Sequence, residues 1–165
     1  MKKLLIATDN FLPRVDGIAV FLDKVVPELS KSYDITIVAP DFEGKRIWYD
    51  GVKIVRIPLS GRVIGDYPAA RYDREKIKEL IKDKDIVWTH SAGPIGSTAS
   101  WYGRRQRKKV VTTVHSVEWE LFFGAITFPR MFSWLFKFMV KWYVKNVYKR
   151  ADVLTVSSKV IEDYL

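Results

Sequence analysis

The chain has 165 residues, 48% of them hydrophobic, and its 28 Lys and Arg against 19 Asp and Glu give a net charge of +9. This length and apolar content suit a single domain with a substantial core, whereas the absence of cysteine excludes a disulfide scaffold, a thiolate metal site and a cysteine nucleophile. No apolar run approaches the roughly 20 residues that span a bilayer, and the positive charge favours an anionic partner such as nucleic acid, acidic lipid or a phosphorylated ligand.

Short runs rich in Val and Ile recur along the chain, and a polar residue follows each of them. The runs are 3–8, 35–40, 86–89, 110–114 and 153–156, and the residues that follow are Asp9, Asp41, His90, His115 and Ser157. Such runs predict parallel strands with crossover helices, and therefore a Rossmann-like α/β three-layer sandwich with a mostly parallel sheet. Ligands bind at the carboxyl ends of strands in open α/β sheets, so these polar residues mark the expected site. Either histidine, taken alone, also fits a structural residue that caps a turn.

The segments between these strands predict the remaining elements in chain order. Helices are expected over 18–31, with Pro27 perturbing the first, over 73–82, over 95–105 and over 130–150. The small residues of 95–105 predict close packing against the sheet or a partner surface. Asp50-Gly51 between two apolar runs, 46–49 and 53–57, predicts a hairpin, and 60–72 is expected to be a loop. Ser157 or Ser158 is a plausible N-cap of a last helix.

The segment 8–17 joins the first strand to the first helix and contains one glycine, whereas a dinucleotide fingerprint requires three. Binding of NAD or FAD is therefore disfavoured. A glycine at a helix N-terminus can still allow backbone N–H groups to approach a phosphate. The alternative is that Gly17 only relieves a tight turn.

Four segments, in order, resemble glycosyltransferase family 4, the retaining nucleotide-sugar enzymes of the GT-B fold. They are Phe-Leu-Pro-Arg-Val-Asp-Gly-Ile at 11–18, His-Ser-Ala-Gly-Pro-Ile-Gly at 90–96, Thr-Thr-Val-His-Ser at 112–116, and 150–158, which carries Arg-Ala-Asp and Val-Ser-Ser. The resemblance covers the amino-terminal half of that family. It implies that residues 1–165 form a single amino-terminal acceptor domain, that the carboxyl-terminal donor domain with its Glu-x7-Glu segment is absent from this chain, and that the chain alone is nearly inactive.

The resemblance also implies a reaction and a set of site residues. A hexose, mannose or glucose, would pass from a GDP- or UDP-sugar substrate to a lipid-linked or phosphorylated acceptor, with no tightly bound cofactor. His115 would be catalytic, beside the transferred sugar, and Gly17 with Asp16 would meet the donor diphosphate. The acceptor would face Asp9, Asn10, Arg14, Asp16, His90 and Glu118. Such chemistry depends mainly on positioning and electrostatics.

A basic and aromatic helix is the other constellation. Lys137, Lys141, Lys145 and Lys149 recur at every fourth position among large aromatics such as Trp142. This pattern is typical of a helix lying on an anionic membrane, although a core-packed helix with a solvated lysine face is the commoner case. We therefore expect a cytoplasmic protein that can sit peripherally on the inner face of the membrane.

Other functions remain open from the sequence. The same enzyme class with a soluble acceptor is one, and a non-catalytic basic domain that binds anionic membrane or, less readily, nucleic acid is another. The basic cluster 104–109 lacks aromatic stacking partners, so we expect no nucleic acid partner. Two histidines at separate strand ends, without carboxylates at ligand spacing, predict no metal site.

Overall fold

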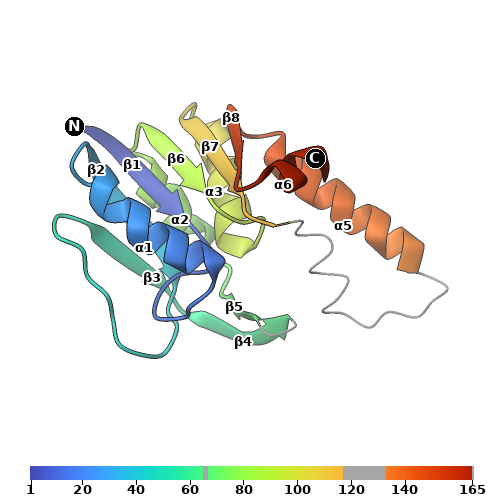
Figure 1. Ribbon diagram of the computed structural model, residues 1–165, viewed down its shortest axis with the longest axis horizontal. Coiled ribbons are helices and arrows are strands. Elements are labelled where there is room, and N and C mark those ends of the chain that lie inside the picture. The colour runs from blue at the N-terminus through green and yellow to red at the C-terminus, as the bar shows by residue number, and fades with distance from the viewer. Residues whose placement is uncertain (65–66, 117–132, 165) are drawn as a thin grey trace.

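Six strands form one parallel sheet in the order β3-β2-β1-β6-β7-β8 in the computed structural model, which describes residues 1–64, 67–116 and 133–164 (Figure 1). The strands are β1 (Lys2–Ala7), β2 (Tyr33–Pro40), β3 (Lys53–Ile57), β6 (Ile86–Thr89), β7 (Lys109–Val114) and β8 (Val153–Val156). Each neighbouring pair runs parallel. The predicted Rossmann-like parallel sheet is confirmed.

Helices cover both faces of this sheet. They are α1 (Gly17–Leu29), α2 (Arg74–Ile81), α3 (Pro94–Arg105), α5 (Ser133–Tyr148) and α6 (Lys159–Tyr164). Alternate residues of β1 point to opposite faces, so Leu4 and Ile6 pack with α1 while Leu5 and Ala7 pack with α2 and α3. Both faces are therefore buried, which is why β1 reads as a continuous apolar run.

Pro27 lies in the last turn of α1, and the helix ends two residues later at Leu29. On the buried side of this helix, Leu22 and Val26 are fully enclosed. Each such side chain stabilises the fold by about 1.5–3 kcal/mol.

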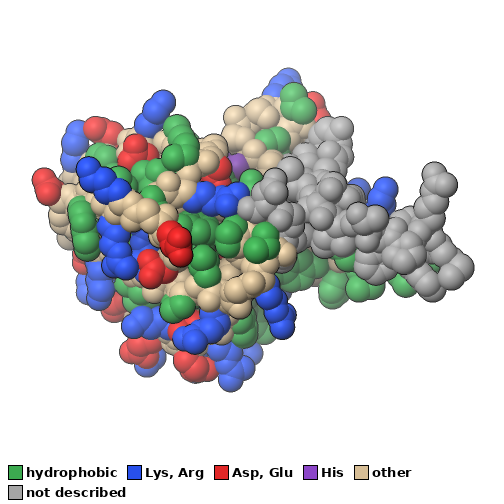
Figure 2. All heavy atoms as spheres, turned by 90° about the horizontal axis from the view of Figure 1, so that it is seen from below, with side chains coloured by type: hydrophobic (Ala, Val, Ile, Leu, Met, Phe, Trp, Pro, Cys, Tyr) green, Lys and Arg blue, Asp and Glu red, His purple; other side chains and the backbone are tan. Residues whose placement is uncertain are grey.

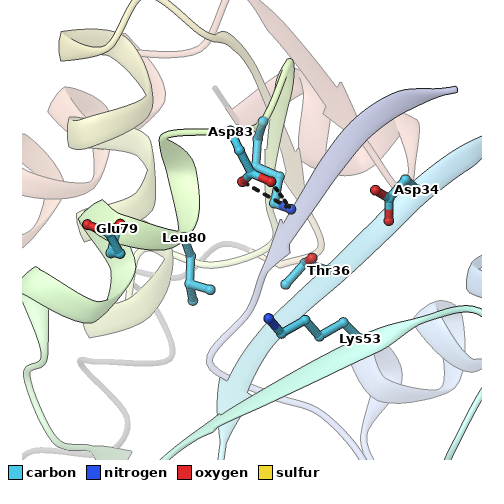
Figure 3. Close-up of a pocket in the computed structure, with 7 residues that line it drawn as sticks. Asp34, Thr36, Lys53, Glu79, Leu80 and Asp83 are labelled. Carbon is cyan, nitrogen blue, oxygen red and sulfur yellow. Dashed lines mark hydrogen bonds and ion pairs between the residues drawn. The ribbon is translucent and has the colours of Figure 1, made fainter.

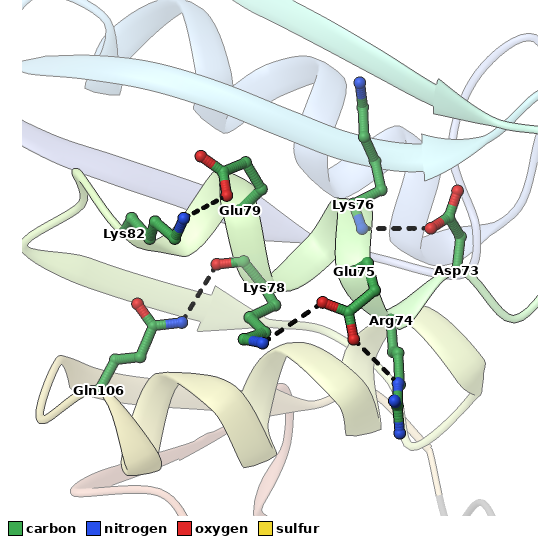
Figure 4. Close-up of polar contacts among 8 residues, drawn as sticks. All are labelled: Asp73, Arg74, Glu75, Lys76, Lys78, Glu79, Lys82 and Gln106. Carbon is green, nitrogen blue, oxygen red and sulfur yellow. Dashed lines mark hydrogen bonds and ion pairs between the residues drawn. The ribbon is translucent and has the colours of Figure 1, made fainter.

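Short-range polar contacts hold α2, as Figure 4 shows. The carboxylate of Asp73 accepts a hydrogen bond from Lys76 N and caps the helix. The helix thus begins where the range predicted from the sequence, 73–82, begins. Glu75 pairs with Lys78 one turn further along, and Gln106 Nε2 donates to the carbonyl of Lys78 from the end of α3. The exposed ion pairs add little stability, so the helix is fixed mainly by its buried Ile77 and Ile81.

The predicted hairpin around Asp50-Gly51 is wrong. Gly51 does occupy a turn with φ of +71°, but residues 46–49 form no strand, and β3 pairs in parallel with β2. Tyr49 instead donates a hydrogen bond to Asp23 of α1, and its ring packs against Phe11. The contacts of this segment with α1 thus replace strand pairing across the turn.

The predicted loop over 60–72 is also wrong. It contains β4 (Leu59–Ile64) and β5 (Tyr67–Ala70), which pair as a small antiparallel sheet outside the main one. Gly61, with φ of +76°, lies where the register shifts between Leu59 and Val63. An irregularity with left-handed backbone needs glycine, so this residue bends a strand rather than ending it.

The small residues of α3 allow it to begin very close to the sheet. A Cβ built on Gly96 would lie 2.1 Å from the carbonyl oxygen of Ser91, and one on Gly93 would lie 2.5 Å from the carboxylate carbon of Asp9. Gly103, at the other end, faces Val87 and Val110 at 3.0–3.3 Å. The expectation of close packing is confirmed, and the surface that α3 meets is the sheet and the loop before the helix.

The last two helices close the β8 side of the sheet. Val144, Val147 and Tyr148 of α5 share a buried cluster with Val114 of β7 and Ile161 of α6. The amino-terminal end of α5 extends away from the sheet (Figure 1). Residues 130–132 of the helix expected over 130–150, and the aromatic segment 119–128, lie outside the described residues. None of the described helices combines the length and apolar character that crossing a bilayer requires.

Substitution Gly96→Ala should lower the free energy of unfolding by about 1–3 kcal/mol, because the added methyl group meets backbone that cannot move aside. Gly17→Ala is the matched control, since nothing lies within 4 Å of a Cβ at this position. Chemical denaturation of both variants checks the prediction. Equal stability of Gly96→Ala and the unsubstituted protein would contradict the packing described for α3.

Candidate functional site

The carboxyl ends of β1, β6 and β7 bring Asp9, His90 and His115 to one edge of the sheet. Trp88 and Thr89 of β6 pair with Val111 and Thr112 of β7, so the residues after these two strands come side by side. The backbone N–H of His90 still donates to the carbonyl of Ala7 at 3.1 Å. The edge predicted from the polar residues after the strands is therefore a real feature of the fold.

The two histidine rings are directly hydrogen-bonded. His90 Nδ1 lies 3.0 Å from His115 Nε2, and the rings are stacked with centroids 5.3 Å apart. The side chain of His90 is fully buried, at 0% exposure, and its other nitrogen, Nε2, has no hydrogen-bond partner. His115 is half-buried. Only His115 of the pair therefore has surface available to a ligand, and the expectation that His90 contacts an acceptor directly is not met by this geometry.

Aromatic side chains enclose the pair. Trp88 lies 4.3 Å from His90 between ring centroids, and the edge of Phe21 meets His115 at 5.1 Å. The indole N–H of Trp88 donates to Thr113 Oγ1 at 2.8 Å, and Thr113 in turn bonds to Thr155 on β8. These contacts hold the rings in fixed orientations. Phe21 is a site residue that sequence reasoning did not identify. Its position one turn after Gly17 is the signal that could have found it.

Burial makes both histidines poor bases. Burial lowers the pKa of His90 well below its usual value, and the neighbouring His115 lowers it further. Burial also lowers the pKa of His115, while the carboxylate of Asp16 acts in the opposite direction. A neutral imidazole pair is thus the state at neutral pH, and one N–H is shared between the two rings.

The amino terminus of α1 lies beside this pair. Asp16 caps the helix, with Oδ1 accepting from Ala19 N at 2.8 Å, while Oδ2 is buried and lacks a hydrogen-bond partner. Gly17, the first helical residue, is exposed with open space where a side chain would be. The first N–H groups of a helix carry partial positive charge, so this corner can receive an anion. The unpartnered Asp16 oxygen can accept a hydrogen bond from a hydroxyl group.

Asp9 is turned away from this corner, towards α3. Its carboxylate accepts hydrogen bonds from Ile95 N at 2.9 Å, Gly96 N at 3.0 Å and the hydroxyl of Ser91. Burial raises the pKa of Asp9, and these three donors oppose that rise. In this structure the carboxylate caps the start of α3, and its contact with an acceptor stays a prediction.

The loop residues Asn10 and Arg14 lie apart from the histidine pair. Asn10 is half-buried, and its backbone closes a turn with Thr8 Oγ1. The guanidinium of Arg14 lies over the rings of Tyr67, at 4.6 Å, and Phe42, at 5.9 Å, with Nε buried and unpartnered. Arg14 thus links the β1–α1 loop to the β4–β5 sheet. Glu118, the last predicted acceptor residue, lies outside the described residues.

A hollow lies at the opposite edge of the sheet. It has a volume of about 340 Å³ and is lined by Asp34, Thr36, Lys53, Glu79, Leu80, Asp83 and Lys84 (Figure 3). Asp34 and Lys53 stand at the starts of β2 and β3, so this hollow shares no residue with the histidine edge. Within residues 1–64, 67–116 and 133–164, no three His, Asp or Glu side chains gather as a metal site.

The sequence profile of Glycosyltransferase Family 4 matches residues 15–165, which is most of the chain. The chain belongs to glycosyltransferase family 4.

Known proteins agree with this family assignment. The chain is similar to a GDP-mannose-dependent alpha-(1-6)-phosphatidylinositol monomannoside mannosyltransferase of Mycolicibacterium smegmatis, with 28% identity over 70% of this chain and 31% of that protein. The Mycobacterium tuberculosis enzyme of the same description is 28% identical over 72% and 32%. The chain thus spans about a third of these relatives' length. A sucrose-phosphate synthase structure from Thermosynechococcus elongatus matches the fold over 100% of this chain and 44% of its own, with a TM-score of 0.55 and 12% identity.

The free energy of unfolding should fall as the pH is lowered from about 7 to 5. Unfolded histidines take up protons below about pH 6.5, whereas the buried pair stays neutral to lower pH, so acid favours the unfolded state. Denaturant unfolding at several pH values measures this slope. His90→Asn should make the pH dependence of the free energy of unfolding less steep. The contribution of Asp9, whose raised pKa adds stability as the pH falls, should remain in this variant. A slope unchanged in His90→Asn would contradict this assignment.

Proposed function

We propose that this domain forms the acceptor side of a retaining glycosyltransferase that moves a hexose from a nucleotide sugar to a lipid-linked or phosphorylated acceptor. The observation that carries the proposal is the position of half-buried His115 beside the start of α1. Phe21 of α1 touches its ring, and Asp16 influences its protonation. A sugar between His115 and Gly17 would place its phosphate near the helix N-terminus.

The chemistry follows from these groups. Departure of the nucleoside diphosphate builds negative charge on phosphate oxygens, which the positive end of the α1 dipole at Gly17 would stabilise. His115, neutral and fixed by its neighbours, offers a hydrogen bond to the transferred sugar without first being reorganised. The carboxylate of Asp16 repels a phosphate, so the helix N-terminus and not this side chain would meet the diphosphate. A second domain, which the family resemblance implies, would supply the rest of the donor site.

The names of the relatives narrow the substrates. Their donor is GDP-mannose and their acceptor a phosphatidylinositol mannoside, as their descriptions state. We therefore place GDP-mannose first among the donors to be tested and a membrane lipid first among the acceptors. UDP-glucose and soluble phosphorylated sugars are the alternatives.

The substitution His115→Ala in the full-length gene product should lower kcat by about 100-fold or more, because the sugar loses a fixed contact close to the reacting carbon. Radiolabelled GDP-mannose with a lipid extract as acceptor measures this. Glu79→Gln, on the exposed side of α2 away from the edge, is the control and should keep full activity. Normal turnover by His115→Ala would contradict the role proposed for His115, whereas no turnover by the unsubstituted protein with any donor would favour the non-catalytic alternative.

A second proposal concerns α5 and a membrane surface. Trp134, Phe138 and Trp142 of α5 are 69%, 64% and 62% exposed. The amino-terminal end of this helix extends beyond the sheet (Figure 1). A hollow of about 240 Å³ is lined by Phe138, Trp142, Asn146 and three lysines, of which Lys141 and Lys145 belong to α5 and Lys149 directly follows it. Exposed aromatics among lysines match an anionic lipid interface, where rings enter the boundary and ammonium groups meet phosphates.

On the face that Figure 2 shows, acidic and basic side chains are interspersed over the body of the domain. The basic cluster 104–109 is partly engaged within the chain: Arg104 pairs with Asp152 at 2.6 Å, and Lys108 donates to the carbonyl of Lys82. Fewer of its cations are thus offered to an external phosphate backbone than the sequence suggests.

The double substitution Lys141→Gln with Lys149→Gln should weaken binding to vesicles of phosphatidylcholine and phosphatidylglycerol by about thirtyfold, since each lysine contributes about 1 kcal/mol near such a surface. Co-sedimentation at low and high salt measures this. Lys24→Gln with Lys76→Gln removes the same charge from exposed positions on α1 and α2 and should bind normally. An equal loss in both pairs would indicate that only net charge matters.

A further inference from the structure

His90 has a chemically unusual environment for a residue with no surface. It is the sole buried imidazole in the described residues, since the chain has two histidines and the other is half-exposed. The hydrogen bond of its side chain is to His115 through Nδ1, and Nε2 has no partner. A purely apolar residue would fill the same space without leaving a buried nitrogen unpaired. The feature to be explained is why an imidazole stands there.

The contact between the rings allows two arrangements of the protons. In the first, His90 carries its proton on Nδ1 and donates it to His115 Nε2, which leaves the proton of His115 on Nδ1. In the second, His115 donates from Nε2, and the proton of His90 sits on Nε2, buried beside Trp88 and Phe21 without an acceptor. Buried N–H groups without an acceptor are rare in folded proteins, which favours the first arrangement.

The carboxylate of Asp16 favours the same arrangement. It acts on His115 electrostatically, and one of its oxygens is unpartnered. Since Nε2 of His115 is occupied by His90, Nδ1 is the nitrogen left to this negative charge. A negative charge attracts an N–H and repels a nitrogen lone pair. Two neighbours of His115, His90 and Asp16, therefore favour the same tautomer.

We propose that His90 is a positioning residue whose Nδ1–H, donated to His115 Nε2, keeps the proton of His115 on Nδ1 and so presents an N–H donor at the ligand edge. His115 then acts towards an oxygen of the bound sugar or phosphate as a hydrogen-bond donor and not as a base. This role in catalysis rests on the function proposed above; the tautomer itself does not. Trp88, tied to Thr113 and through it to Thr155, holds the His90 ring in the required plane.

The tautomer can be measured directly. Two-bond proton–nitrogen correlation spectra of the 15N-labelled chain distinguish a protonated from an unprotonated ring nitrogen, and only two imidazoles contribute. The expected result at neutral pH is a protonated Nδ1 on both rings. A protonated Nε2 on His115 in the unsubstituted protein would overturn the proposal.

Substitutions at position 90 separate positioning from packing. Asn carries an amide nitrogen as many bonds from Cα as Nδ1 of His, whereas Gln places its amide where Nε2 stands and Phe keeps a ring without nitrogen. His90→Asn should keep the Nδ1–H form of His115, and His90→Phe should shift it towards the Nε2–H form. Amide spectra report whether each variant is folded. If His90→Phe does not fold, the comparison of Asn with Gln decides, and an unchanged tautomer in a folded His90→Gln or His90→Phe overturns the proposal.

Activity provides the second measurement, in the full-length protein. His90→Phe should lower kcat by about 10- to 100-fold with a smaller change in the donor KM, and His90→Asn should recover most of the loss. A purely structural role would give equal losses in variants of equal stability, and that result counts against positioning. If the tautomers behave as expected but no sugar transfer is found with any donor, the proposed function fails while the assignment of His90 stands.

Discussion

Parallel pairing of β6 with β7 is the constraint from which the site follows. It sets the two strand ends level, so that the residues after them, His90 and His115, can share a hydrogen bond of 3.0 Å. Antiparallel pairing would have sent the two ends to opposite edges of the sheet. A second parallel pairing places β1 beside β6, and the β1–α1 loop then brings α1, through Phe21, against His115. The site is therefore a product of the topology as much as of any single residue.

Polarity within this edge is divided between two sides. On the side of α1, buried rings surround a neutral imidazole pair and one unpartnered oxygen of Asp16. On the side of α3, the carboxylate of Asp9 accepts hydrogen bonds from three donors. A low-dielectric surrounding strengthens each remaining interaction with a ligand. The unsatisfied groups lie where the helix α1 begins, and the satisfied ones hold α3 in place.

Much of the frame was predictable from sequence because burial on both faces produces Val- and Ile-rich runs with a clear polar end. The errors arose where tertiary contacts outweighed local preference. Asp50-Gly51 favours a hairpin, yet Tyr49 bonds to Asp23 of α1, and β3 pairs with β2. Gly61 and Pro68 suggested a loop, whereas they belong to a pair of strands with a shift in register. The partners of Asp9 are more than 80 residues away in sequence, so no local pattern reveals them.

The glycines at the start of α3 bear on how an alignment of this family would be interpreted. Gly93 and Gly96 have no room for a methyl group, because Asp9 and the carbonyl of Ser91 occupy that space. Selection against every other amino acid would act there through van der Waals overlap, even though neither residue needs to touch a sugar or a phosphate. Invariance in the His-Ser-Ala-Gly-Pro-Ile-Gly segment would thus have two causes, steric exclusion and substrate recognition. Its glycines would be invariant for the first reason.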